Sequence, residues 1–390
     1  MVVATARPTK LESRTVNTLD DLGLVANAWT HLQTLSSEAT VFSTWQWNHA
    51  SARHLWPADA LRVTLVEDGG DPVAIWPLAA RRIAGCKGLS FLGSGPWDYG
   101  RADYQDALIE DGWETEACDA LIAKLQATSG EWEVVMLQDL PPSSRLLGVL
   151  PAMAGEQGWS VKVEPDNDSY RVPLPATWDE YTSTLSTNVR SNLGRKQRKL
   201  EREHNGRFER VDTSEDVESA MDLLFALHNH RWQEKNGGKD VKTIFSRDDI
   251  RAFHLEVARN MLWAGMLDLT LLRADASVIG ARYSFQFNGT KSFYASGYRT
   301  DEEWARFSLG AVMDLQSIQA SIDAGLQFED LLRNDGGYKA RYAPQRLDNQ
   351  RLFIYRTRSA RARCEAYFGL RSLAKRALQR RKVLRPASSD

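Results

Sequence analysis

The chain has 390 residues, with 49 lysines and arginines against 51 aspartates and glutamates, which gives a formal net charge of −2. This length predicts two domains or one duplicated unit. A content of 43% hydrophobic and 26% charged residues excludes collagen-like, coiled-coil and wholly disordered chains. Three widely separated cysteines form no C-x-x-C pair, so neither a disulfide framework nor a zinc site is expected. No apolar run approaches the ~20 residues of a membrane span, and the N-terminus lacks the apolar core of a signal peptide, so we expect a cytoplasmic protein.

In the first half, apolar residues alternate between helical and strand periods. The pattern predicts helices over 19–35 and 114–127, and strands over 61–67, 73–80 and 132–138. The strands 61–67 and 73–80 form a hairpin around Asp68-Gly69-Gly70-Asp71. Pro77 places the second of them near a sheet edge or a bulge, because proline has no N–H to donate.

The second half repeats this order of elements. Strands over 267–272 and 278–287 form another hairpin, and each hairpin is followed by an aromatic strand, a loop, a helix and a buried strand. A long helical stretch over 178–263 begins with a basic run, Arg190 to Arg210, which either is a solvated helix face or contacts phosphates. We interpret the repeat as a duplication of one α/β unit, although a hairpin followed by a helix also recurs by chance. The boundary is expected at 164–175.

A candidate anion site lies where the polar loop 299–307 enters a strongly helical run. Ser308 is a suitable N-cap, and Gly310 lets a ligand approach the backbone closely. Arg306 precedes them. The first turn of such a helix offers free N–H groups and the positive end of the helix dipole, which suits a pyrophosphate. An ordinary capped helix has the same sequence pattern.

After this helix comes a strand with Asp330, a turn beginning at Asn334, and then Tyr338-Lys339. The string D-L-L-R-N-D-G-G-Y-K-A-R-Y resembles the signature of the CelD/FemAB-like branch of the GNAT acyltransferase superfamily. The matching positions are Asp330, Leu332, Arg333, Tyr338, Lys339 and Tyr342. Ser308-Leu309-Gly310 is similar to the small-Pro-Gly helix start of that branch, with Leu309 in place of proline. Asn334 stands where glycine is usual and tolerates the same left-handed backbone.

The resemblance covers about residues 15 to 357, because Leu227-His228-x-x-Arg231-Trp232 and the first-half strings VFSTWQW and VAIWPL also match. It implies an α/β (α+β) fold of two tandem GNAT-like mixed-sheet units with flanking helices. The expected domains are 14–165, 170–357 with the helical insertion and the donor site, and a basic helical tail over 358–390. It further implies an acyl-coenzyme A donor, such as acetyl-coenzyme A, bound at Arg306, Ser308, Leu309 and Gly310.

Four residues are candidates for the acyl-transfer chemistry. His228 is the natural base because its ordinary pKa lies near 6.5, although a lone histidine on an apolar helix is often a core residue. Asp330 could orient a base or bind an acceptor amine, and it could equally pair with an arginine. Tyr338 could protonate the thiolate or simply pack. Lys339 could hold a phosphate or the acceptor, or be a solvated charge.

On the acceptor side, Asp103 and Tyr104 combine a carboxylate with an aromatic ring, which suits a sugar or an amine. The resemblance adds Arg231 and Trp232 to the substrate-binding candidates. The seven histidines lack metal-ligand spacing, so no metal site is expected.

The C-terminal segment is strongly basic. Eleven cations and one acid, Glu365, lie between Arg356 and Pro386, so the rest of the chain has 38 cations, 50 anions and a formal charge of −12. The apolar face of the helix predicted over Arg361–Arg385 could pack against the body or a partner, lie on an anionic membrane, or bind nucleic acid.

We therefore expect an acyltransferase that moves an acyl group from acyl-coenzyme A to an amine or hydroxyl, on a sugar or a cell-envelope or exopolysaccharide precursor. Direct attack is expected, because no cysteine lies in a motif that suggests a covalent intermediate. The nearest alternative is a FemAB-type peptidoglycan aminoacyltransferase with an aminoacyl-transfer RNA donor. Only under this alternative do we expect a nucleic acid as a partner. A second alternative is a non-catalytic scaffold of a polysaccharide synthesis complex.

Overall fold

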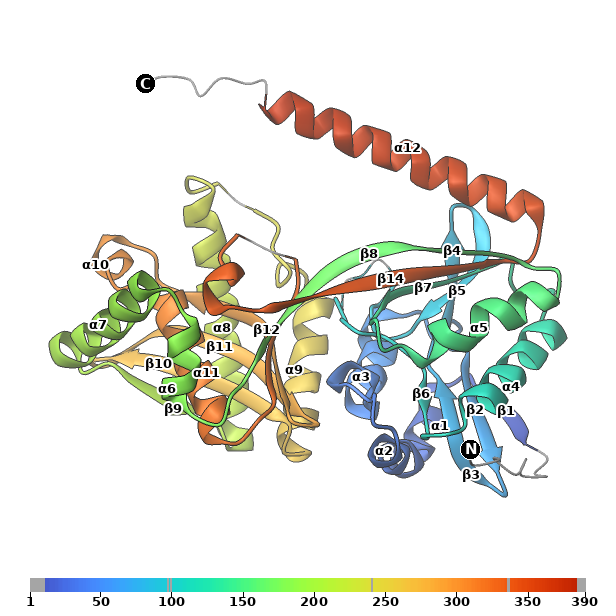
Figure 1. The fold of residues 1–390 in the computed structure, drawn as a ribbon, viewed down its shortest axis with the longest axis horizontal. Coiled ribbons are helices and arrows are strands. Elements are labelled where there is room, and N and C mark those ends of the chain that lie inside the picture. The colour runs from blue at the N-terminus through green and yellow to red at the C-terminus, as the bar shows by residue number, and fades with distance from the viewer. Residues whose placement is uncertain (1–10, 97, 99, 240, 335–336, 384–390) are drawn as a thin grey trace.

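The computed structural model describes residues 11–96, 98, 100–239, 241–334 and 337–383. Two α/β halves lie side by side and are joined by a pair of long strands, with a single long helix extending from the far edge of the first half (Figure 1).

The first half begins with a strand and three helices, continues with a run of strands, and ends with two helices that alternate with strands. Its strands are β1 (Glu12–Val16), β2 (Val63–Asp68), β3 (Asp71–Trp76), β4 (Leu78–Ile83), β5 (Cys86–Phe91), β6 (Leu108–Ile109), β7 (Val134–Leu140) and β8 (Ser160–Pro173). Its helices are α1 (Leu19–Leu24), α2 (Ala26–Leu35), the 3₁₀ turn η1 (Val41–Ser43), α3 (Trp45–Leu55), α4 (Glu114–Ala127) and α5 (Arg145–Glu156).

The second half begins with helices and ends with strands. Its helices are α6 (Trp178–Thr184), α7 (Thr187–His204), α8 (Ser214–Lys235), α9 (Asp248–Trp263), α10 (Glu302–Ala305), α11 (Leu309–Asp323) and the 3₁₀ turn η2 (Lys339–Tyr342). Its strands are β9 (Arg207–Arg210), β10 (Leu267–Ala274), β11 (Ser277–Phe287), β12 (Thr290–Tyr298), β13 (Phe328–Arg333) and β14 (Gln345–Tyr355). The last element is α12 (Arg358–Val383).

One mixed sheet runs through both halves, in the order β4-β5-β7-β14-β8-β13-β12-β11-β10-β9, while β1-β2-β3-β6 form a separate sheet in the first half. The two halves have matching parts, because β5 and β7 are parallel and linked through α4, just as β12 and β13 are parallel and linked through α11. Each such crossover needs a helix between its strands. The repeat inferred from the sequence is therefore present in the topology.

The strands β8 and β14 join the halves. They pair antiparallel along almost their whole length, and β14 also pairs with β7 while β8 also pairs with β13. The stretch 164–175, predicted to hold the domain boundary, thus lies largely within β8. Each half receives an edge partner from the other.

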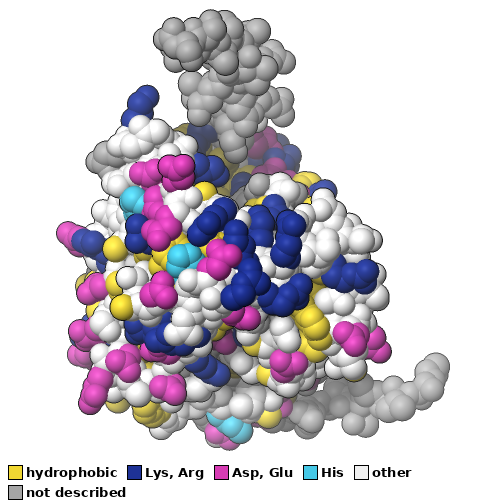
Figure 2. Space-filling model, turned by 90° about the vertical axis from the view of Figure 1, so that its left-hand side faces the viewer, with side chains coloured by type: hydrophobic (Ala, Val, Ile, Leu, Met, Phe, Trp, Pro, Cys, Tyr) yellow, Lys and Arg dark blue, Asp and Glu magenta, His cyan; other side chains and the backbone are white. Residues whose placement is uncertain are grey.

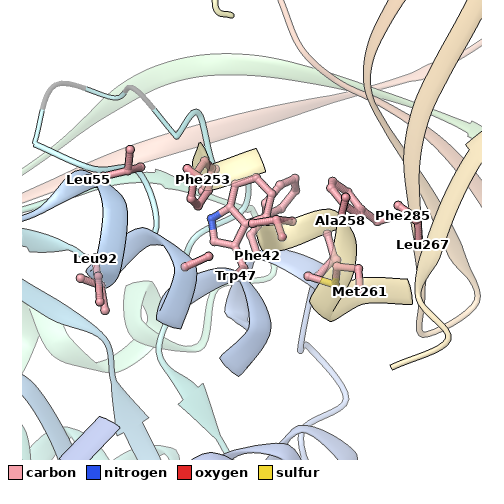
Figure 3. Close-up of a cluster of buried hydrophobic side chains, with 14 of the residues drawn as sticks. Phe42, Trp47, Leu55, Leu92, Phe253, Ala258, Met261, Leu267 and Phe285 are labelled. Atoms are coloured by element: carbon pink, nitrogen blue, oxygen red, sulfur yellow. The ribbon is translucent and has the colours of Figure 1, made fainter. Parts of the chain in front are cut away.

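A shared hydrophobic core lies between the halves (Figure 3). Trp47 from α3 is fully buried, and its ring meets Phe253 of α9 at a centroid distance of 5.2 Å and Phe285 of β11 at 5.8 Å, both edge to face. Phe42 packs against the same ring at 4.8 Å. Aromatic pairs of this geometry add to the burial of apolar area, so the halves are held as one body.

Two predicted elements are divided in the structure. The helix over 19–35 breaks at Val25, where the indole Nε1–H of Trp45 donates to the carbonyl of Leu22 across 2.9 Å and replaces a helical hydrogen bond. The strand over 73–80 ends at Trp76, and after Pro77 the chain enters the other sheet as β4. Pro77 therefore lies at a crossing between two sheets, and the strand that follows it, β4, is an edge strand of the large sheet, as expected for a proline near a sheet edge.

Among the side chains of α12 that the structure describes, those in its first turns contact the body. Ala360 and Cys364 are buried beside β4 and β5, and Phe368 lies 5.6 Å from the ring of Phe353. Further along, Leu370 and Leu373 are 68% and 62% exposed. Of the predicted tail, Arg385 and the side chains of residues 375–383 lie outside the described residues. In the part of the chain that the structure describes, no helix has the length and apolar character of a membrane span.

Candidate active site

The candidate site forms where β12 and β13 part. These parallel strands pair only over Thr290–Ser292 and Phe328–Asp330. From Phe293 onward β12 keeps its partner β11 on one side but has no strand on the other. Backbone groups along this edge therefore lack a ladder partner, and a ligand can bind them.

A hollow of about 640 Å³ occupies this parting. Its walls come from β12, β13, the start of α11, the end of α8, the turn after β13, and the first-half loop that contains Arg101 and Asp103. The volume is typical of a site for a small molecule or cofactor.

The start of α11 opens into this hollow through Ser308, Gly310 and Ala311. The expected side-chain N-cap is wrong: Ser308 has a left-handed backbone with φ of 53°, caps no N–H, and instead accepts a hydrogen bond from the ammonium of Lys196 at 2.6 Å. Glycine is favoured at position 310 for a steric reason, because a Cβ there would lie 2.7 Å from the ring of Tyr298. That ring lies over the first turn of the helix.

Positive charge exceeds negative charge around the hollow. Among the residues that the structure describes, its lining contains six cations, Arg101, Arg231, Lys235, Arg333, Lys339 and Arg341, and two acids, Asp103 and Asp314. The Arg231 guanidinium stacks on Tyr298 at 4.3 Å, beside the start of α11. The first turn of α11 has no acidic residue, whereas the corresponding helix of the first half, α4, begins with Glu114 and Glu116. An anion is thus favoured at α11 and disfavoured at α4.

Two predicted catalytic residues hold the walls of the parting. The Nδ1–H of His228 donates to the carbonyl oxygen of Ser296 on β12 at 2.9 Å. His228 is buried, does not line the hollow, and burial lowers its pKa to about 4, so it is neutral at physiological pH. The ammonium of Lys339 is also buried and donates to the carbonyls of Leu332 and Arg333, each at 2.9 Å, at the end of β13.

Tyr338 and Asp314 line the hollow itself. Burial, reinforced by the charge of Asp314, raises the pKa of the Tyr338 phenol, so it keeps its proton at neutral pH. The Asp314 carboxylate accepts the hydroxyl of Tyr342 at 2.9 Å, and Arg282 lies 3.5 Å away. Arg231 and Trp232, one turn beyond His228, reach the hollow that His228 does not.

Arg333 links the hollow to the first half. Its guanidinium is buried and donates to Asp103 at 2.8 Å, to Asp98 at 2.8 Å and to the carbonyl of Ala102, and it lies 3.2 Å from Asp139. The surrounding carboxylates raise its pKa despite its burial. This cluster fixes Asp103 at the edge of the hollow.

Four predicted site residues lie elsewhere. Asp330 and Tyr104 are joined by a hydrogen bond of 3.0 Å and line a different hollow at the other end of the strand pair. Arg306 is exposed, beside His204 and Glu203, and does not line the hollow at the parting. Leu309 is buried against the core beside Phe307 and Met313, so only its backbone is available to a ligand.

Sequence reasoning missed Arg101, Tyr298, Asp314 and Arg341. A signal for Asp314 exists, since Asp314, Ser317 and Ser321 form a polar stripe at helical spacing in an otherwise apolar helix. No sequence signal places Arg101, because its loop comes from the other half.

Residues 187–340 match the family model described as acetyltransferase (GNAT) domain. This range runs from the start of α7 into η2 and includes the parting of β12 and β13. Among curated proteins, none matches the chain in sequence.

Solved structures share the fold over most of the chain. FemX is 11% identical, with 88% of this chain and 97% of FemX covered and a TM-score of 0.59. L-PGS from Bacillus licheniformis is 10% identical, with 87% and 94% covered and a TM-score of 0.51. A conserved protein of unknown function from Bacteroides thetaiotaomicron is 11% identical, with 88% and 100% covered and a TM-score of 0.52. The expected α/β fold of two tandem units is confirmed, and so is the GNAT resemblance.

Proposed function

We propose that the chain, whose residues 187–340 form a GNAT acetyltransferase domain, transfers an acyl group from acyl-coenzyme A to an amine or hydroxyl on a sugar or another cell-envelope or exopolysaccharide precursor. One observation carries this proposal: the hollow at the parting combines an unpaired strand edge, a helix whose first turn has no acidic residue, more cations than acids among the described lining residues, and a tyrosine that keeps its proton at neutral pH.

The donor is proposed to lie in the parting. Its pyrophosphate would bind the first-turn N–H groups of α11 near Gly310, with Arg231 and Arg341 nearby. Its amide-containing arm would then lie along the free edge of β12, as an extra strand does at an open sheet edge. The thioester would then lie near Tyr338.

The proposed reaction is direct attack of the acceptor on the thioester carbonyl. A C–N or C–O bond forms, the C–S bond breaks, the thiolate takes the proton of the Tyr338 hydroxyl, and the proton that the acceptor loses returns to the Tyr338 phenolate through solvent. Backbone N–H groups on the free edge of β12 would stabilise the oxyanion. Asp103, fixed by Arg333, lies on the first-half side of the hollow and would accept a hydrogen bond from the attacking group.

Calorimetric titration of the full chain with coenzyme A, acetyl-coenzyme A and longer thioesters tests the donor. Binding, followed by thiol release when an amino sugar is added, is the expected result. The Tyr338→Phe variant should bind the donor equally well and release thiol about tenfold to a hundredfold more slowly. Absence of binding by every thioester would refute the proposal.

The basic face around α7 favours one alternative donor. α7 lies at the end of the molecule that faces the viewer in Figure 2, where Lys and Arg side chains gather. Arg190, Arg195, Arg198 and Arg202 of α7 are exposed. An aminoacyl-transfer RNA donor predicts binding that falls steeply with salt, with no binding of coenzyme A.

We further propose that α12 holds the protein at an anionic lipid surface on the cytoplasmic side. Leu370 and Leu373 are exposed shortly after Phe368, next to Arg371, and the rest of the helix sequence is basic. Flotation with vesicles containing phosphatidylglycerol should retain the full chain and lose the Leu370→Glu/Leu373→Glu variant. Equal flotation of both proteins, or none with the full chain, contradicts this proposal.

A further inference from the structure

A second hollow, of about 380 Å³, lies at the end of the β12–β13 pair where the strands still pair. Its lining combines first-half residues, including Tyr104 and Pro141–Ser143, with Arg171 of β8, Ser292 of β12 and Asp330 of β13. Tyr104 and Asp330, which are joined by a hydrogen bond, line this second hollow and do not line the hollow at the parting.

An acid and a base face each other there without pairing. Asp330 and Arg171 are direct cross-strand partners on antiparallel β13 and β8, a position at which Cβ atoms are about 5 Å apart and opposite charges normally pair. Asp330 instead accepts the hydroxyl of Tyr104 at 3.0 Å and the N–H of Leu332 at 2.7 Å.

The guanidinium of Arg171 is held flat by an aromatic ring. Its central carbon lies 4.2 Å from the centroid of Phe328. Its Nε is buried and finds no hydrogen-bond acceptor among the residues that the structure describes. A buried donor without an acceptor costs free energy, and a ligand anion would restore the missing hydrogen bonds.

We infer that this second hollow binds a small organic anion, whose carboxylate or phosphate pairs with Arg171 and whose amine or hydroxyl group meets Tyr104 and Asp330. A stacked guanidinium presents its N–H groups in a plane that matches both anions. The volume lies within the usual range for small-molecule pockets.

Two acidic residues on the lining, Glu38 and Asp330, do not prevent an anion from binding in this hollow. Glu38 lines the hollow but is exposed to solvent. Burial raises the pKa of Asp330 to about 7, so part of the protein carries it uncharged at neutral pH and its repulsion of an anion is reduced. The inference concerns binding and does not depend on the acyl transfer proposed above.

Calorimetric titration of the full chain with three probes tests it: inorganic phosphate, glycine and glucosamine 6-phosphate. At least one should bind at millimolar concentration, and glucosamine 6-phosphate should bind more tightly than inorganic phosphate because it adds an amine and hydroxyls. Arg171→Met should weaken binding by about tenfold or more. Arg171→Lys should bind with intermediate affinity.

The matched control is Arg346→Met, which removes an arginine on neighbouring β14 that pairs with Asp168 and Asp348 and does not line the hollow. It should bind all probes as the parent does. Tyr104→Phe provides a second variant if Arg171→Met does not fold. It should weaken the binding of glucosamine 6-phosphate and leave the binding of inorganic phosphate unchanged. Failure of all three probes to bind the parent, or equal binding by Arg171→Met, overturns the inference. Coenzyme A binding, measured in the same variants, reports separately on the donor hollow.

Discussion

The imidazole of His228 donates its Nδ1 hydrogen to the carbonyl oxygen of Ser296, 2.9 Å away, and so ties α8 to β12 beside the parting. The approach of the two elements is close, because a Cβ on Gly297 would lie 2.3 Å from the backbone nitrogen of His228. His228 is therefore a positioning residue for the strand that carries the free edge.

Replacing His228 distinguishes positioning from base catalysis. His228→Asn keeps an N–H donor near Ser296, so we expect it to retain most activity, whereas His228→Ala should lose activity and about 1–3 kcal/mol of unfolding free energy. Steady-state kinetics and urea unfolding measure these effects. Because burial lowers the His228 pKa to about 4, kcat/KM of the parent should show no inflection from this group near pH 6.5. Equal, complete loss of activity in both variants at unchanged stability would instead indicate a base.

A side chain at position 310 should weaken binding of the acyl-coenzyme A donor. In Gly310→Val the new atoms push the Tyr298 ring, which lies 2.7 Å from an added Cβ, and crowd the first turn of α11. We expect coenzyme A affinity, measured by calorimetry, to fall about tenfold or more, which corresponds to about 1.4 kcal/mol. Gly148→Val is the control, because Gly148 lies in a helix with open space around it. Unchanged affinity in Gly310→Val would place the donor elsewhere.

Asp330 should make stability depend on pH. Its folded-state pKa of about 7 lies above the ordinary value of about 4, so the folded protein holds a proton that the unfolded chain has lost. This stabilisation is complete below about pH 4 and disappears as pH rises through about 7. Relative to Asp330→Asn, the parent should therefore lose up to about 3 kcal/mol of unfolding free energy between pH 5 and 8. Urea unfolding at both pH values tests this; parallel profiles contradict it, and exposed Asp348→Asn is the control.

The buried ion pair under α11 should be strongly coupled. Arg282 donates to Glu329 at 2.9 Å, and Glu329 also accepts the hydroxyls of Ser317 and Ser321 at 2.8 and 2.6 Å. Removing one partner leaves a buried charge, so Glu329→Gln or Arg282→Met should each cost about 3–5 kcal/mol. The double variant should cost clearly less than the sum of the two. Urea unfolding of the four proteins gives the coupling, and additive losses would show that the two groups act independently.

The sequence predicted local elements well where periodicity and turn residues agree. The helix 114–127 has the expected bounds, and the strand expected around Asp330 is present as β13. Asn334 adopts the left-handed backbone with φ of 65° that its position in the motif implies. Gly310 and Tyr338, which the sequence resemblance singled out, both line the hollow at the parting.

Partners across the sheet could not be predicted. The register of β8 against β13 brings together Arg171 and Asp330, which are far apart in the chain, and no local pattern encodes that register. The same holds for Arg333 and Asp103, whose contact depends on how the two halves pack. Catalytic roles were assigned to His228 and Lys339 from their side-chain chemistry alone. The sequence does not show that both side chains donate hydrogen bonds to backbone carbonyls.

The exchange of β8 and β14 has a consequence for dissection of the protein. A gene split after β8, between residues 173 and 178, would encode one fragment that ends with β8 but lacks the partner for β7, and another that contains β14 but lacks the partner for β13. Each product alone would expose unpaired strand edges and aggregate. Produced together in one cell, the two polypeptides should reassemble through the β8–β14 ladder, so the molecule can be divided only into complementing fragments.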